Sequence, residues 1–155
     1  MSKKPNLLFF GIDSLRRDHM SHYGYSRLTT PHISRYAEGG VTFNHCFSAH
    51  IPTTPGYSNM MTGRDCFGTG VVGLSQPAIV EGVPVLAEIL RDNGYNTTCV
   101  GFEGNAAGRG YDKYIGFSGW GPDHEDGRAH KAENLNDVAI PELERLAKED
   151  KPFML

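Results

Sequence analysis

The sequence has 155 residues, the size of a single domain that buries its own core. Its net charge of −3, from 15 Lys and Arg against 18 Asp and Glu, gives no broad basic surface, which argues against nucleic acid and anionic membranes as partners. The three cysteines have no paired or metal-like spacing, which argues against a disulfide framework or a zinc knuckle. The N-terminal apolar run is too short for a signal peptide or a membrane span. We therefore expect a cytoplasmic protein with reduced thiols.

The first predicted element is a strand over residues 7–12, a continuous apolar run that ends at Asp13. Such a run is typical of a strand that is buried on both faces of a parallel sheet. Ligands of open α/β sheets bind outside the carboxyl ends of the strands, so Asp13 stands where a metal ligand or a catalytic acid is expected. The alternative is that Asp13 or Ser14 caps the following turn.

A helix is predicted next over residues 31–40, with Thr30 as its N-cap, a proline at its first position and two glycines at its end. Apolar residues on one of its faces are expected to join the core: Ile33, Tyr36 and Ala37. The alternating pattern of residues 41–47 then predicts a strand.

A loop that runs into a short helix follows that strand. Thr53 and Thr54 form a pair at the predicted N-cap, Pro55 stands at the first helical position, and Gly63 follows as the C-terminal stop. The free N–H groups and the positive end of the helix dipole would hold a phosphate or sulfate there, against a hydroxyl. The alternative is that Thr-Thr-Pro is an ordinary helix cap.

The second half of the chain alternates between regular and irregular segments. In order, the patterns predict a glycine-rich loop at 65–77, a helix at 85–94, a strand at 97–102, an irregular segment at 103–128, a helix at 135–148 and a strand at 151–155. The candidates for the buried side of the last helix are Val138, Leu143 and Leu146. Because the sequence ends inside an apolar strand, we expect it to be the N-terminal part of a longer protein.

Several short motifs follow one another at defined spacing: Asp13, Leu15-Arg16-Arg17-Asp18, Tyr23-Gly24, Thr30-Pro31-His32-Ile33, Ala37-Glu38-Gly39-Gly40, Thr53-Thr54-Pro55, Thr62-Gly63-Arg64, Asn93-Gly94-Tyr95 and Lys151-Pro152-Phe153. In this order they resemble the N-terminal half of the sulfatase family, within the alkaline phosphatase superfamily. The resemblance implies an α/β fold, an alkaline phosphatase-like sandwich with a largely parallel central sheet flanked by helices. Residues 1–155 would be the N-terminal part of one catalytic domain.

By resemblance, Thr53 occupies the position of the catalytic nucleophile. Sulfatases carry there a cysteine or serine that is converted to formylglycine within the motif Cys/Ser-x-Pro/Ala-x-Arg. Threonine cannot give that aldehyde because its β-carbon carries a methyl group, and Tyr57 stands in place of the motif's arginine. The Lys and His of the family's Gly-Lys-Trp-His also have no counterpart near residues 101–104. These departures favour phosphoester over sulfate ester chemistry.

The resemblance also implies one or two divalent metal ions, Zn, Mn or Ca. Asp13 and Thr53 would be two ligands of one ion, whereas Ser14 replaces the second acid that sulfatases commonly carry. The remaining family ligands would lie beyond residue 155. Asp123 and His124 have suitable side chains, but their acidic surroundings favour a solvated loop.

The resulting hypothesis is a metal-dependent hydrolase of phosphate esters, either phosphodiesters or phosphonate monoesters, that acts through the hydroxyl of Thr53. The alternatives are a sulfatase, a phosphoryl-group transferase, or an inactive relative that binds anions. The expected partner is a small anionic ester. A homo-oligomer is left open.

Overall fold

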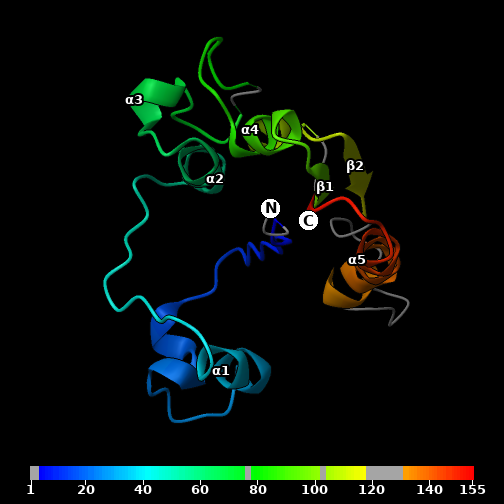
Figure 1. Cartoon of the computed structure of the whole chain (residues 1–155). Helices are drawn as coiled ribbons and strands as arrows, with labels where there is room; N and C mark the ends of the chain where they lie inside the picture. The colour runs from blue at the N-terminus through cyan, green and yellow to red at the C-terminus, as the bar shows by residue number, and fades with distance from the viewer. Residues whose placement is uncertain (1–3, 76–77, 102–103, 118–130) are drawn as a thin grey trace, which may run out of the picture. The chain divides into compact units, whose positions relative to one another are not determined.

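The structure, a computed structural model, describes residues 4–75, 78–101, 104–117 and 131–155 (Figure 1). The chain divides into a larger unit, residues 1–9 and 49–155, and a smaller unit, residues 10–48. The helices and strands in chain order are η1 (Arg17–His19), η2 (Ser21–Tyr23), α1 (Pro31–Ala37), α2 (Thr53–Thr62), α3 (Cys66–Thr69), α4 (Leu86–Asp92), β1 (Asn96–Gly101), η3 (Ala106–Gly108), β2 (Lys113–Gly116), α5 (Lys131–Ala147) and β3 (Phe153–Met154).

The larger unit is built on a parallel sheet with the strand order β2-β1-β3. The N-terminal segment continues the sheet on the far side of β3, where Leu7 forms a parallel bridge to Met154. Backbone hydrogen bonds fix this pairing, because the Leu7 N–H donates to Phe153 O (2.7 Å) and the Phe9 N–H donates to Leu155 O (2.7 Å). The predicted α/β class with a parallel sheet and flanking helices is confirmed.

Helices cover both faces of this sheet (Figure 1). Successive residues of a strand point to opposite faces. On one face Thr98 donates to Glu142 of α5, and Asn96 donates to Glu149 just after the end of that helix. On the other face Met154 joins an apolar cluster with residues of α2, η3 and the segment before α4: Met61, Val71, Ile79, Val83, Val85, Ala106 and Ala107. Helix α2 therefore packs on this core through Met61 near its C-terminal end and, less deeply, through Tyr57.

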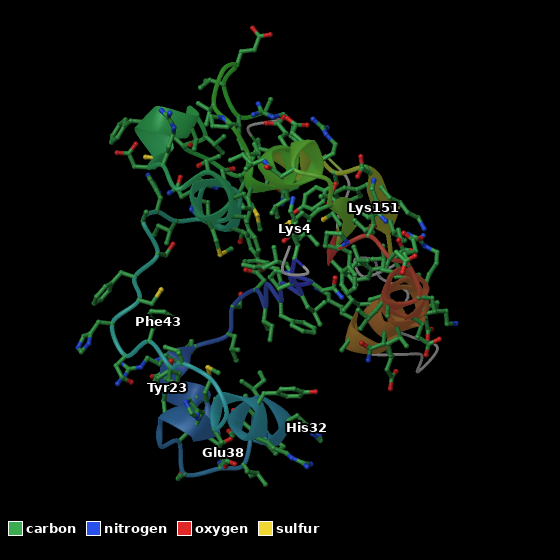
Figure 2. The ribbon with its side chains drawn as sticks, viewed as in Figure 1. Lys4, Tyr23, His32, Glu38, Phe43 and Lys151 are labelled. Atoms are coloured by element: carbon green, nitrogen blue, oxygen red, sulfur yellow. The ribbon has the colours of Figure 1, made fainter. Side chains whose placement is uncertain are left out.

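The smaller unit is held by hydrogen bonds between its own turns and α1. The Ser21 N–H donates to Thr30 Oγ1 (3.1 Å), and the Tyr23 hydroxyl donates to Phe43 O (3.1 Å). Figure 2 shows Tyr23 and Phe43 close together. The exposed ion pair of Arg16 and Asp18 belongs to the same unit and lowers the pKa of the Asp18 carboxyl.

Two predicted strands differ from the structure. In the segment predicted at 7–12, only the part around Leu7 pairs, and the side chains of Leu7, Leu8 and Phe9 are 39% to 46% exposed rather than buried. The reason is that this segment has β3 on one side and no neighbouring strand on the other within the described ranges. Residues 41–47 form bends at 44–45 and no regular structure elsewhere, so the predicted strand there is wrong.

The positions of the helices were predicted more closely than the burial of their residues. The helices expected near 31–40, 85–94 and 135–148 correspond to α1, α4 and α5. Of the three expected buried residues of α5, Leu146 is fully buried, whereas Val138 and Leu143 are half-buried. The expected core face of α1 is wrong: Tyr36 is 86% exposed and Ile33 is also exposed.

Candidate functional site

The candidate site is the first turn of α2. The helix begins two residues earlier relative to its proline than predicted: Pro52 is the N-cap, Thr53 is the first helical residue, and Pro55 is the third. Pro52 O accepts the Gly56 N–H (3.1 Å), which starts the helical ladder. Proline is tolerated at the third position because the first N–H groups of a helix have no acceptor within it. At the other end Gly63 adopts φ +66 and ends the helix, as predicted.

The local charge at this turn favours an anion. Thr53 is half-buried, and the backbone amides of Thr53 and Thr54 lie at the positive end of a helix of ten residues. Pro55 contributes no N–H group to this end. The first turn therefore combines a hydroxyl with partial positive charge, which is the arrangement that a phosphate or sulfate group favours.

Thr54 has a role that sequence reasoning missed. Its side chain is buried, and its Oγ1 donates to Leu74 O at 3.2 Å. The pattern placed Thr54 beside Thr53 as half of a capping pair, but the structure uses its hydroxyl to hold the segment after α3. The sequence offered only a weak signal for this role: two adjacent residues of a helix point in different directions, so one of the two threonines is expected to face the core.

Tyr57 stands where the resemblance expects an arginine. It is half-buried and packs against the apolar cluster of the larger unit. This position of α2 therefore contributes to packing in this chain.

Asp13, the other predicted site residue, lies in the smaller unit. It is exposed and occupies a turn with Ser14, whose φ of +59 lies in the left-handed region that few residues other than glycine adopt. Thr53 belongs to the larger unit. That Asp13 and Thr53 bind one metal ion stays a prediction.

We tested whether the residues present fit a metal ion. The described ranges contain no group of three or more His, Cys, Asp or Glu side chains that could hold one. A carboxylate and a hydroxyl alone leave a divalent cation without most of its ligands. Asp123 and His124, considered from the sequence, lie outside the described residues.

No helix among the described residues has both the length and the apolar character needed to cross a membrane.

Comparisons with known proteins place these features in a family. The family model named Sulfatase matches residues 5–155. An N-acetylgalactosamine-6-O-sulfatase of Bacteroides thetaiotaomicron is 33% identical over 104 residues, which cover 64% of this chain and 20% of that protein. An N-acetylglucosamine-6-O-sulfatase of the same organism is 26% identical over 168 residues, which cover 99% of this chain and 30% of that protein.

A solved structure agrees in fold. The structure of BT4656 in complex with D-glucosamine-2-N,6-O-disulfate matches with a TM-score of 0.79 and 24% identity, over 98% of this chain and 33% of that one. The chain thus spans a third or less of the length of these relatives. Since the family model covers nearly the whole sequence, the chain belongs to the sulfatase family of the alkaline phosphatase superfamily.

Proposed function

We propose that the complete protein hydrolyses sulfate esters, with a carbohydrate as the alcohol part of the ester. The family match over residues 5–155 carries this proposal, and relatives named as hexosamine sulfatases support it. The sequence predicts a phosphate ester hydrolase, with a sulfatase as the alternative, and the family match supports the sulfatase better. An ester hydrolase is common to both.

In this proposal the first turn of α2 binds the sulfate group. The amides of Thr53 and Thr54 and the positive end of the helix dipole stabilise the negative charge of the sulfate oxygens. Additional negative charge develops on the ester oxygen as its bond to sulfur breaks, and the same positive end stabilises it. The sulfatase family typically uses a divalent metal ion, which would add further stabilisation of that charge. The ion is Zn, Mn or Ca in our proposal, and metal analysis of the purified protein identifies it.

One observation favours a second candidate, the hydrolysis of phosphate esters. The nucleophile position holds Thr53, which cannot become formylglycine. Its Oγ would attack phosphorus in line, so that an O–P bond forms while the bond to the alcohol breaks and the leaving alcohol takes a proton. Water would then hydrolyse the phosphothreonine and return the free hydroxyl.

One set of assays separates these candidates. The complete protein is given an aryl sulfate, a sulfated hexosamine and an aryl phosphodiester, and the released sulfate or phosphate is measured. We expect sulfate release, and Thr53→Ala should lower kcat about a thousandfold or more if Thr53 is the nucleophile. Thr62→Ala is the matched control, because the Thr62 hydroxyl lies at the opposite end of α2, where it donates to Ser58 O (2.7 Å) and accepts the Arg64 N–H (3.2 Å).

Each other result has a defined meaning. Phosphate release without sulfate release replaces the first candidate by the second. Full activity of Thr53→Ala shows that Thr53 is not the nucleophile. Binding of the esters without turnover of any of them contradicts both candidates and supports an inactive, anion-binding relative.

Two assignments remain, the partner and the location. We propose a small anionic ester as the partner, because the positive end of α2 and the sulfatase family match favour one. We propose the cytoplasm as the location, because the unpaired cysteines favour a reducing compartment. Fractionation of cells that produce the protein tests the location.

A further inference from the structure

The segment Gly70–Ser75 follows α3, and its first residues, Gly70 and Val71, are held in place by the surrounding structure. Gly70 adopts φ +71, and a Cβ there would lie 2.4 Å from Val80 Cγ1, so only glycine fits. The Val80 N–H donates to Thr69 O (2.9 Å), which closes the base, and Val71 is fully buried in the apolar cluster. The base of the segment is therefore anchored to the core.

The far part of this segment is held at the start of α2. Thr54 Oγ1 donates to Leu74 O at 3.2 Å, and Thr54 itself is buried. Thr54 directly follows Thr53, so this bond keeps Leu74 next to the turn that carries the proposed anion site. The side chain of Leu74 is 62% exposed, and that of Val72 is also exposed.

We propose that Thr54 is a positioning residue that holds Val72 and Leu74 as an apolar wall beside the anion site, where they contact the C–H face of the sugar of a sulfated carbohydrate. This inference rests on the proposed function and adds a determinant of specificity to it. The anionic group binds the helix terminus, so the alcohol part must extend away from that terminus. An anchored apolar surface beside it gains free energy when it covers C–H groups of the sugar.

The first experiment tests the positioning role without any substrate. Amide hydrogen exchange of residues 71–75 is measured in the complete protein for the wild type, Thr54→Val, Thr54→Ser and Thr62→Val. Loss of one hydrogen bond should speed exchange about five- to tenfold in Thr54→Val. Thr54→Ser should restore the wild-type rate because it keeps the hydroxyl.

Thr62→Val is the matched control on the same helix, since its hydroxyl bonds within α2. It should leave exchange of residues 71–75 unchanged. Wild-type exchange in Thr54→Val, or an equal increase in Thr62→Val, overturns the positioning role.

The second experiment tests the apolar wall in the complete protein. Leu74→Ser should raise KM for a sulfated hexosamine about tenfold and leave kcat within about twofold, since the contact is made with the bound sugar. The inhibition constant of inorganic sulfate, which has no organic part, should not change. Phe67→Ser is the matched control, because Phe67 is an exposed apolar residue of α3.

The outcomes separate this inference from the proposed function. An unchanged KM in Leu74→Ser, or an equal increase in Phe67→Ser, overturns the wall while sulfatase activity stands. If the wild type hydrolyses no ester, the proposed function fails, and calorimetric binding of the sulfated hexosamine then decides. Weaker binding by Leu74→Ser alone supports the wall, and equal binding by wild type and Leu74→Ser overturns it.

Discussion

Two buried polar regions of the larger unit differ in how their side chains are paired. On α5, Glu142 is only 4% exposed, and its carboxylate accepts hydrogen bonds from Arg145, Lys113 and Thr98. In the middle of α2, Ser58 and Asn59 are also buried, yet the Ser58 hydroxyl and both amide atoms of Asn59 find no hydrogen-bond partner among the described residues. One helix thus meets the core through a paired charge and the other through unpaired polar groups.

The paired region joins α5 to two strands of the sheet. Arg145 approaches the Glu142 carboxylate in a bidentate manner (2.8 and 2.9 Å), Lys113 of β2 donates to Oε2 (2.7 Å), and Thr98 of β1 donates to Oε1 (3.0 Å). These donors, Arg145 foremost, lower the pKa of Glu142 to about 2 against the opposing effect of burial. Burial alone therefore does not decide whether a polar residue stabilises this unit. The number of hydrogen-bond and charge partners of the buried side chain decides it.

The largest expected effect is the loss of the paired carboxylate. Glu142→Ala should lower the free energy of unfolding by about 3 kcal/mol, because it leaves the buried Thr98 hydroxyl unpaired and opens a cavity beside Leu146. Urea unfolding followed by circular dichroism measures it. Glu144→Ala on the same helix is the control, since Glu144 is exposed, and it should change stability by about 0.5 kcal/mol or less. Equal effects of both variants would contradict the special role of Glu142.

A smaller effect should appear on acidification. The pKa of Glu142 is about 2 in the folded protein and 4.5 in its ordinary range, so the stabilisation is complete above pH 4.5 and is lost as the pH falls toward 2. We expect the difference in unfolding free energy between wild type and Glu142→Gln to shrink by roughly 2 kcal/mol over this range, discounted because Lys113 and Arg145 are about half exposed. A difference that does not depend on pH between 5 and 2.5 would refute the assignment.

The same comparison shows what the sequence could predict. Helices α2 and α4 and strand β1 carry local signals, such as Gly63 at a helix end, and were predicted. Strand β2 was missed because it is four residues long and starts with the charged Lys113. The burial of Glu142 was missed because a helix pattern assigns a glutamate to solvent, and its partners on β1 and β2 are 29 to 44 residues away.

In the candidate site, too, some features follow from local sequence patterns and others do not. The hydroxyl at the start of α2 follows from Thr53 and the helix signals next to it, and the structure confirms the helix while the nucleophile stays a prediction. The tether from Thr54 to Leu74 spans 20 residues and depends on the path of the segment after α3, which no local pattern determines. Contacts between distant segments therefore account for most of what was missed.

The smallest expected effect concerns the unpaired region, and its sign is opposite. Asn59→Leu keeps the number and branching of the side-chain heavy atoms, removes a buried amide that has no partner among the described residues, and adds apolar surface to a buried face of α2. It should raise the free energy of unfolding by about 1 kcal/mol, whereas a paired amide would make the same change destabilising. Urea unfolding of the 155-residue chain measures the sign.

Asn93→Leu provides the contrast, because the Asn93 amide donates to Ile89 O (2.8 Å) at the end of α4, so its loss should destabilise slightly. A loss of stability in Asn59→Leu would mean that the amide is paired in solution, through a buried water or another polar group. Glu142 and Asn59 would then differ in the kind of hydrogen-bond partner that each has, and not in whether each has one.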